Sequence, residues 1–361
     1  MTLLDLVRSE PSIPGRDPAL PPVISSRVRL ARNFADAPFP GRAGEEAGAR
    51  LWERIRVVLC GLSSMPAPVI AGGNEEIDEL GRQVLLERHL ISREHAGKGR
   101  GSGVVLSGDG AIAVLVNEED HLRLQAMLPG LRLEEAWSRI DDVDTELERA
   151  VEYAFSPRWG YLTACPSNVG TGMRASVMLH LPGLVLMDEM GPVVRGIQKI
   201  GLAVRGLQGE GTAADGHLFQ VSNQMTLGER EADLVATLDQ IVREIVGHEM
   251  NARARLRQKR EALFRDRVGR AAGVLANAHV LSSKEALDLL SVLRLGGEAG
   301  IIKIARPEAL DRLMLWVQPG HVQWTEGRRL SQGRRDQARA DRVRAGVALA
   351  IRGDRRRGKS G

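Results

Sequence analysis

Aromatic residues and lysine are scarce in this sequence of 361 residues. Phe, Trp and Tyr make up 3% of the chain, which leaves Leu, Val, Ile and Ala to build the core. So few aromatic side chains also argue against recognition of nucleic acid by base stacking. Lysine supplies only six of the 50 basic residues, so the positive charge is almost entirely arginine.

Paired cysteines, long apolar runs and an amino-terminal leader are also missing. The two cysteines, Cys60 and Cys165, form neither a disulfide framework nor a metal-ligand spacing, and we predict no metal-ligating residues. No run of about 18 apolar residues is present that could cross a membrane. Residues 1–22 carry acids and prolines in place of a basic and then apolar signal. We therefore expect a cytoplasmic protein without membrane association.

The net charge of +4 is unevenly distributed. Residues 328–361 contain eleven arginines, so the rest of the chain is close to neutral or acidic. The basic tail could serve as an arm for nucleic acid, but the remaining composition does not favour such a partner.

Hydrophobic periodicity predicts strands and segregated helices, which indicates the α+β class. Helices are expected at 43–60, 133–155, 173–181 and from 228 to about 267, and strands at 104–107, 111–117, 202–205 and 217–221. Ser282 to Glu285 has the pattern of a capping box, and Pro307 suits the first turn of another helix. We predict an irregular segment at 1–19, a main domain at 20–255 and a helical C-terminal domain at 256–361.

Five arginines in polar or glycine-rich contexts are candidates for binding phosphate, because the guanidinium fork pairs bidentately with phosphate oxygens. They are Arg27, Arg29, Arg123, Arg174 and Arg205. Each could equally be a solvated surface charge in so arginine-rich a chain. Gly353 to Ser360 matches the phosphate-loop pattern GxxxxGK[ST], but no helix follows it, so we expect the arginines to bind any nucleotide.

Acidic residues and one cysteine complete the set of candidates. Glu118, Glu119 and Asp120 follow an apolar strand, where acids are usually solvated. Glu210 lies in a glycine-flanked loop that could simply be mobile. Cys165 precedes a proline in a polar, glycine-rich loop, where a positive field would favour the thiolate, although a lone cysteine is usually inert.

Four motifs carry a resemblance to a known family. They are Ser25-Ser-Arg-Val-Arg29, Asn117-Glu-Glu-Asp-His-Leu-Arg123, Cys165-Pro-Ser-Asn-Val-Gly-Thr-Gly-Met-Arg174 and Arg205-Gly-Leu-Gln-Gly-Glu210. In this order and spacing they resemble the ATP:guanido phosphotransferases, or phosphagen kinases, over roughly residues 20–250. The resemblance implies a catalytic domain at 20–255, with an antiparallel sheet flanked by helices.

The resemblance also implies a role for each candidate. Glu119 and Glu210 would hold the substrate guanidinium, one of them as general base, and Cys165 would align it. The five arginines would bind the triphosphate of ATP, with Mg²⁺ bridging the phosphates and Glu118 as an outer-shell partner. Members of the family place a histidine four residues after the arginine that matches Arg174. This chain has Met178 there, and the nearby His180 takes its place as the candidate adenine contact.

Within the family, the chain is most similar to the bacterial protein arginine kinases. Gly160-Tyr-Leu-Thr-Ala-Cys165 and Val177-Met-Leu-His-Leu-Pro-Gly183 resemble that branch. The first motif begins only at Ser25, which leaves no room for the small N-terminal domain of phosphagen kinases, and some 100 residues follow the catalytic region. Arg335-Asp336-Gln-Ala-Arg339-Ala340 resembles the branch's allosteric phosphoarginine-binding motif, and a basic helical or disordered tail is the plainer interpretation.

The resemblance predicts a protein arginine kinase that tags proteins for degradation and regulates the stress response. It implies a homodimer, protein substrates, a Clp-type unfoldase and protease, a stress-gene repressor and a zinc-binding activator protein. Two alternatives are a phosphagen kinase acting on free arginine and a non-catalytic regulator that binds phosphoarginine or DNA. The complete set of candidate catalytic residues counts against the second alternative.

Overall fold

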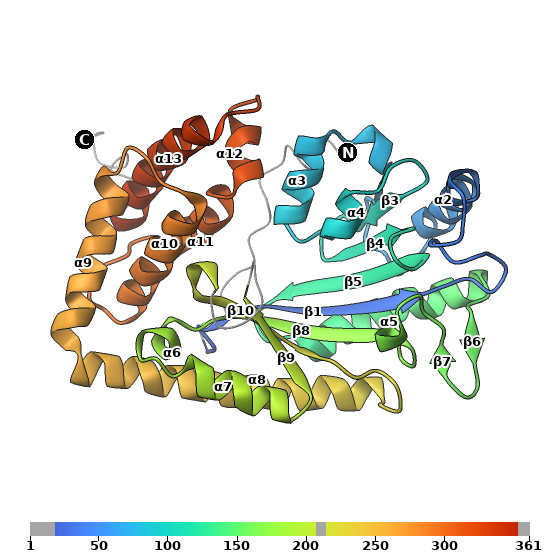
Figure 1. Cartoon of the computed structure of the whole chain (residues 1–361), viewed down its shortest axis with the longest axis horizontal. Coiled ribbons are helices and arrows are strands. Elements are labelled where there is room, and N and C mark those ends of the chain that lie inside the picture. Colours follow the sequence, from blue (N-terminus) through green and yellow to red (C-terminus); the bar gives the residue numbers. More distant parts are fainter. Residues whose placement is uncertain (1–18, 207–213, 353–361) are drawn as a thin grey trace, which may run out of the picture. The chain divides into compact units, whose positions relative to one another are not determined.

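The computed structural model describes residues 19–206 and 214–352, which divide into two compact units (Figure 1). The first unit contains the chain up to Met178, with Gln198–Ala203 and Val221–Arg243. The second contains Leu179–Ile197, Val204–Gln220 and the chain from Glu244 onward. Each unit therefore combines several stretches of sequence, and no single boundary along the chain separates the two units. The predicted domain boundary at 255 stays a prediction, and helix α8 (Glu231–Lys259) continues past it.

An eight-stranded sheet, in the order β2-β3-β4-β5-β1-β8-β10-β9, is the main feature of the fold. Antiparallel pairing links β1 to β5, β2 to β3, β3 to β4 and β4 to β5. The strands are β1 (Val23–Arg32), β2 (Ile70–Gly73), β3 (Gly103–Leu106), β4 (Ile112–Val116), β5 (Leu122–Pro129), β8 (Met173–His180), β9 (Leu202–Gly206) and β10 (Leu218–Asn223). A separate hairpin pairs β6 (Phe155–Ser156) with β7 (Gly160–Tyr161). The predicted α+β class with an antiparallel sheet is confirmed.

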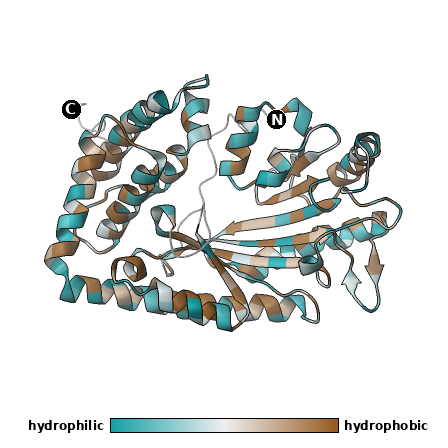
Figure 2. Cartoon of the chain, in the orientation of Figure 1, coloured by the Kyte–Doolittle hydropathy of each residue, from teal (hydrophilic) through white to brown (hydrophobic). Residues whose placement is uncertain are grey.

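Alternation along β1 gives the sheet two different faces. Val28 and Leu30 are fully buried, whereas Arg27 and Arg29, which alternate with them, are only partly buried. Helix α5 (Leu133–Ala150) packs on β1 and β5 with Ile140 and other apolar residues of one stripe. Figure 2 shows both hydrophobic and hydrophilic segments along the long central strands. The apolar side chains are thus used for packing, and polar ones are left for the other face.

The predicted helix at 173–181 is wrong, because this segment is strand β8. Met173, Ala175, Val177 and Leu179 are all fully buried, and the residues between them include Arg174. This is the two-residue period of a strand. The apolar content of the segment is equally compatible with a short helix, so composition alone did not distinguish the two.

The remaining helices of the first unit are α2 (Glu45–Cys60), α3 (Glu79–Glu87) and α4 (Arg93–Ala96). Those of the second unit include α6 (Pro182–Leu186), α7 (Met190–Lys199), α9 (Glu261–Asn277), α10 (Ser283–Glu298), α11 (Pro307–Trp316), α12 (Pro319–Thr325) and α13 (Gln332–Arg352). The helical pattern expected from 228 to about 267 is broken at Arg260, whose backbone leaves the helical region between α8 and α9. Ser282 caps α10 as predicted, since its side chain accepts a hydrogen bond from the backbone N–H of Glu285. No helix in the described ranges is long and apolar enough to cross a membrane.

A buried ion pair joins the end of β1 to α5. Arg32 Nη2 lies 2.6 Å from Asp144 Oδ2, and both side chains are less than a tenth exposed. Tyr153 donates its hydroxyl proton to Asp144 at 3.0 Å, and Arg32 Nη1 donates to the carbonyl oxygen of Thr171 at 2.9 Å. The guanidinium carbon lies 3.5 Å from the centre of the Tyr161 ring. This pair therefore holds β1, α5 and the segment before β8 together.

Replacing Arg32 by methionine should leave the carboxylate of Asp144 buried without its partner. We expect Arg32→Met to lower the free energy of unfolding by about 3–5 kcal/mol. Arg270 forms an exposed pair with Asp266 on α9, and Arg270→Met should cost about 1 kcal/mol or less. Urea unfolding of both variants tests the difference. Equal losses would show that the Arg32 pair adds nothing beyond an exposed one.

Candidate active site

The turn between β4 and β5 presents three consecutive acids. Asn117 begins the turn with a φ of 56°, in the left-handed region that asparagine tolerates better than most residues. Its side-chain amide donates to the carbonyl oxygens of Gly101 at 2.6 Å and Gly48 at 3.0 Å. The turn is therefore fixed at its first residue to two neighbouring segments.

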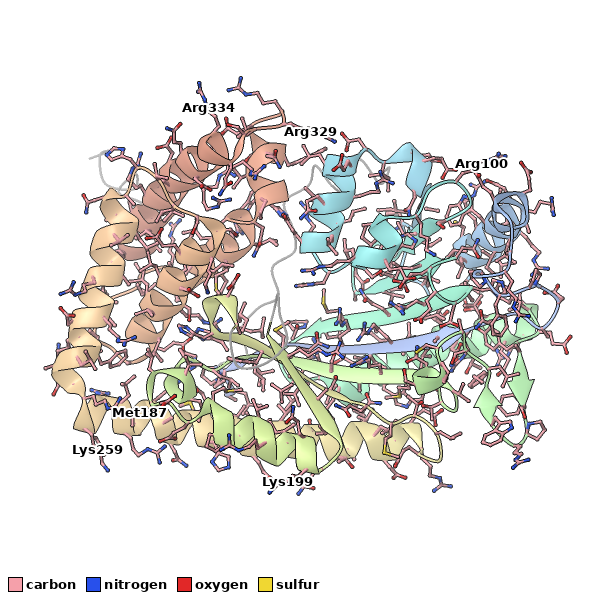
Figure 3. All side chains as sticks on the ribbon, viewed as in Figure 1. Arg100, Met187, Lys199, Lys259, Arg329 and Arg334 are labelled. Carbon is pink, nitrogen blue, oxygen red and sulfur yellow. The ribbon has the colours of Figure 1, made fainter. Side chains whose placement is uncertain are left out.

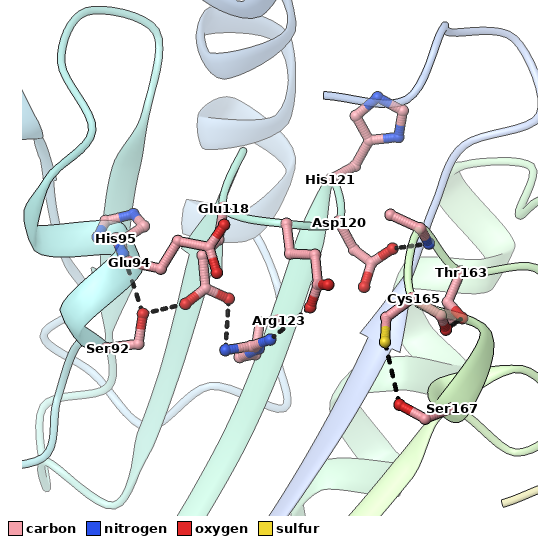
Figure 4. A network of polar contacts seen from close by, with 12 residues as sticks. Ser92, Glu94, His95, Glu118, Asp120, His121, Arg123, Thr163, Cys165 and Ser167 are labelled. Carbon is pink, nitrogen blue, oxygen red and sulfur yellow. Dashed lines mark hydrogen bonds and ion pairs between the residues drawn. The ribbon is translucent and has the colours of Figure 1, made fainter. Parts of the chain in front are cut away.

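Glu118 and Glu119 have different surroundings although they are adjacent in sequence. The Glu118 side chain is fully buried, lies 2.6 Å from Arg123 Nη1 and accepts a hydrogen bond from Ser92. The Glu119 side chain is 33% exposed and lies 3.4 Å from Arg123 Nη2. Figure 4 shows Arg123 beside Glu118 in this network. Glu118 therefore orients the arginine, and Glu119 remains accessible to a substrate.

Burial raises the pKa of Glu119, and the negative charge of Asp120 raises it further. The positive charge of Arg123 acts in the opposite direction but does not outweigh them. A carboxylate with a raised pKa is a stronger base than an ordinary glutamate. Glu119 is thus suited to accept a proton.

Asp120 connects the acidic turn to the loop that carries Cys165. Its Oδ1 accepts hydrogen bonds from the backbone N–H of Ala164 and from Asn33 Nδ2, both at 2.6 Å. The Sγ of Cys165 lies 3.0 Å from Ser167 Oγ, and Thr163 Oγ1 donates to the carbonyl oxygen of Cys165 at 2.8 Å. These contacts place the thiol close to the acidic turn (Figure 4).

Four of the five predicted arginines lie together on the sheet. In the β1–β5 register Arg29 is opposite Gln125 and Ala31 is opposite Arg123, so Arg123 shares a face with Arg29 and Arg27. Burial, then the charges of Arg174 and Arg123, lower the pKa of Arg27 to about 10. Burial, Arg27 and the same two arginines also lower the pKa of Arg29. The four guanidinium groups therefore repel one another across one face.

This cluster fits a polyanionic group such as a triphosphate. Arg29 Nε is buried and has no hydrogen-bond partner among the described residues. Like charges this close are unfavourable unless an anion neutralises them, and phosphate oxygens match both the charge and the fork geometry of arginine. The carboxylate of Glu118 opposes the lowering of the Arg29 pKa but does not outweigh it. A triphosphate is therefore the group that this face is best suited to bind.

No group of three or more His, Cys, Asp or Glu residues suited to holding a metal ion occurs within residues 19–206 and 214–352. The side chains of the described residues by themselves therefore offer no cluster of ligands for Mg²⁺. The ion usually keeps several waters and binds through substrate phosphates. A nucleotide bound to the arginine face would bring such phosphates to the site.

The other predicted site residues lie in different surroundings. Arg205 is exposed on β9, in the second unit. His180 is fully buried and its Nε2 lies 2.7 Å from Ser291 Oγ, so the structure gives an adenine no access to it. Glu210 and the phosphate-loop match at Gly353–Ser360 fall outside the described residues.

The predicted phosphoarginine-binding motif lies on α13. Arg339 is 2% exposed, and it donates from Nε to the carbonyl oxygen of Val317 and from Nη1 to that of Leu281, at 2.6 and 2.7 Å. It also pairs with Asp336 at 2.5 Å. Arg335 is half-buried and donates to the carbonyl oxygen of Leu330 at 3.2 Å. Arg339 therefore has a packing role, and Arg335 is more accessible to a ligand.

Sequence reasoning missed three residues that position the site: Asn33, Arg32 and Ser92. Asn33 accepts from the backbone N–H of His121 and donates to Asp120, which fixes the acidic turn from both sides. No local pattern identifies Asn33, because its partners are nearly 90 positions away. Arg32 follows Arg27 and Arg29 closely, but its burial against α5 was not evident from the sequence.

Comparison with known proteins shows the family of the chain. Residues 69–252 match the family described as ATP:guanido phosphotransferase, C-terminal catalytic domain. The chain belongs to this family. Residues 261–356 match the protein-arginine kinase McsB C-terminal domain.

Curated relatives are similar over nearly the whole chain. The protein-arginine kinase of Moorella thermoacetica is 45% identical over 94% of this chain and 98% of its own length. That of Halothermothrix orenii is 42% identical over 95% of this chain and 99% of its own length. Among solved structures, the duplicated taurocyamine kinase of Schistosoma mansoni is 29% identical with a TM-score of 0.54, covering 64% of this chain and 33% of its own. Lombricine kinase, at 23% identity and a TM-score of 0.57, covers 69% of this chain and 71% of its own and supports the fold.

Asp120→Asn tests the role of Asp120 in setting the pKa of Glu119. Oδ1 of the asparagine can still accept from Ala164 and Asn33, so the loop should keep its position. A base loses activity as the pH falls through its pKa, and removing the negative charge should lower the pKa of Glu119. The acidic limb of kcat/KM against pH should therefore move to lower pH in the variant. An unmoved limb would show that Glu119 is not the titrating base.

Proposed function

We propose that this protein transfers the γ-phosphoryl group of ATP to the guanidinium group of arginine side chains in proteins. The observation that carries the proposal is the adjacency of four arginines to the partly exposed Glu119, whose loop is bonded to that of Cys165. This places a phosphate-binding face next to a base and a thiol that suit a guanidinium. The similarity to protein-arginine kinases over nearly the full length supports a protein as the acceptor.

The phosphate-binding face would act mainly by positioning and charge. Arg27, Arg29, Arg123 and Arg174 would hold the triphosphate and neutralise the negative charge on the transferred phosphoryl group. Arg205 is proposed as the fifth member of this set from its motif. When bound together with the nucleotide, Mg²⁺ would supply further neutralisation of the phosphate charge.

The acceptor guanidinium needs to lose a proton before its nitrogen can attack phosphorus. Its pKa lies above about 12, so a nearby base is required. Glu119 has the position and the raised pKa for this task. Glu210 and Cys165 are proposed as further contacts that align the guanidinium, so that one terminal nitrogen faces the γ-phosphorus.

A first experiment separates the protein-directed activity from one on free arginine. The purified protein is incubated with ATP and Mg²⁺ and either an unfolded acceptor protein or free arginine, and acid-labile phosphate is measured. We expect phosphate on the protein and little on free arginine. Turnover of free arginine alone would support the phosphagen-kinase alternative, and binding of phosphoarginine without turnover would support the non-catalytic one.

Glu119→Gln keeps the shape of the side chain but removes the base. It should lower kcat on the protein acceptor by roughly 10²-fold or more, with ATP binding little changed. Glu134 is exposed on α5, and Glu134→Gln is a matched control that should behave as wild type. Normal turnover in Glu119→Gln would contradict the assignment of the base.

We also propose a regulatory role for α13 and a place in protein turnover, both of which follow from the resemblance of its motif to that of the protein-arginine kinases. Tagged proteins would go to a Clp-type unfoldase and protease, with a zinc-binding activator and a stress-gene repressor as further partners. The protein would act as a cytoplasmic homodimer. Arg335 and Asp336 would bind phosphoarginine, while Arg339 holds the motif in place.

Arg335→Ala should abolish binding of free phosphoarginine outside the catalytic centre without loss of folding. Arg334 is exposed and projects outward (Figure 3), so Arg334→Ala serves as the matched control. Calorimetry with phosphoarginine in saturating ATP analogue should show saturable binding in wild type and in Arg334→Ala only. Unchanged binding in Arg335→Ala would contradict the proposal, and salt-sensitive binding of a DNA duplex instead would favour a nucleic-acid arm.

A further inference from the structure

Three residues of α10 contact the short segment Asp215–His217 through their side chains. The segment directly precedes β10. Helix α10 and the segment both belong to the second unit. We propose that Lys284, Asp288 and Ser291 of α10 form a positioning platform that holds this segment in the conformation needed for catalysis. The inference rests on the proposed kinase function, because it assigns positioning residues for that reaction.

Ser291 lies between two imidazoles. Its Oγ is 2.7 Å from His180 Nε2 and 2.7 Å from His217 Nδ1, and Ser291 is fully buried. A hydroxyl has one proton, so it can donate to one ring and accept from the other. Burial lowers the pKa of His217, which favours the neutral ring that such an arrangement can use. The serine thus fixes the position of His217 relative to β8, where His180 is the last residue.

Asp288 and Lys284 hold the two preceding residues. The backbone N–H of Gly216 donates to Asp288 Oδ1 at 2.8 Å, and Lys284 Nζ donates to Asp215 Oδ1 at 2.9 Å. Lys284 also donates to Asp288 Oδ2 at 3.2 Å, which keeps the two platform residues together. Every residue from Asp215 to His217 therefore has its own contact on α10.

The backbone of this segment needs such support. Gly216 has a φ of 65° and His217 a φ of 54°, so two consecutive residues adopt the left-handed conformation. Glycine does so without cost, but histidine at this φ is unfavourable by about 1 kcal/mol or more. The bond between His217 and Ser291 compensates for a conformation that the chain would otherwise avoid.

Chain connectivity gives the platform its relevance to catalysis. Glu210 lies five positions before Asp215, and Arg205 is on β9, the neighbour of β10 in the sheet. Asp215–His217 leads directly into β10, so its position bears on the strand that lies beside Arg205 on β9. Small displacements of reacting groups can cost about 10²-fold in rate, so a loose anchor should lower kcat.

The same helix is held at its start by α13. Arg339 donates to the carbonyl oxygen of Leu281, and the backbone N–H of Leu281 donates to the carbonyl oxygen of Asp336 at 3.1 Å. Leu281 directly precedes Ser282, the cap of α10. The orientation of the platform is therefore set by α13 at one end of α10.

Variants of Ser291 and His217 test the platform in the full-length protein. Ser291→Ala and His217→Ala remove the hydrogen bond, whereas Asn at 217 can place a polar atom where Nδ1 was and tolerates a positive φ. We expect kcat on a protein acceptor to fall by roughly 10-fold or more in both alanine variants. The KM for ATP should stay nearly unchanged, and His217→Asn should keep most of the activity. Glu285→Gln, at an exposed position of the same helix, should match wild type.

Hydrogen exchange of peptides covering residues 214–220 supplies a second measurement that does not depend on activity. Exchange should be faster in both alanine variants and close to wild type in His217→Asn. If the folded alanine variants have the same kcat and the same hydrogen-exchange rates as the wild type, the proposed platform is contradicted. If Ser291→Ala does not fold, the comparison of His217→Ala with His217→Asn decides, and equal kcat and exchange there would overturn it. An inactive wild type would refute the kinase function, while the exchange results would still test the anchor.

Discussion

Mutual repulsion among Arg27, Arg29, Arg123 and Arg174 is the constraint around which the first unit is organised. The register of β1 with β5 places three of these charges on one face, and β8 supplies the fourth. The opposite face is apolar and packs on α5. Burial of these apolar side chains offsets the unfavourable free energy of the charged face. An isolated cluster of this kind would weaken folding. An anion bound to this face would relieve the repulsion.

The acidic turn holds Glu119 near these cations and leaves it partly exposed. Glu118 pairs with Arg123 in the interior, so the pairing is satisfied by a residue that no substrate reaches. Glu119 lies farther from the arginine and keeps a third of its surface exposed. The Oδ1 atom of Asp120 accepts a hydrogen bond from the backbone N–H of Ala164, in the loop that carries Cys165. Three adjacent acids thus perform three different tasks, because backbone geometry turns each toward a different neighbour.

Sequence reasoning predicted the parts of this arrangement that depend on local spacing. Arg27 and Arg29 share a face because they are two apart on a strand, and the alternation of β1 makes this visible. The helix expected at 173–181 was wrong because a short apolar run fits either period. Asn33 and Arg32 could not be found, since their roles depend on partners more than 80 positions away. The assignment of Arg339 to a phosphoarginine-binding motif stays a prediction, and its burial against Val317 and Leu281 follows only from helix packing.

The placement of Arg339 changes how a sensor on α13 could work. A guanidinium that already donates to two carbonyl oxygens and a carboxylate is costly to redirect toward a ligand, because each buried acceptor would lose its partner. A phosphoarginine at Arg335 and Asp336 would instead act on Arg339 indirectly, by competing for Asp336. Since Arg339 donates to the carbonyl oxygen of Leu281, which directly precedes the cap of α10, a displacement of Arg339 would be felt at the first turn of that helix. Helix α10, which holds Asp215–His217, therefore provides a hydrogen-bonded route from α13 to the segment that precedes β10.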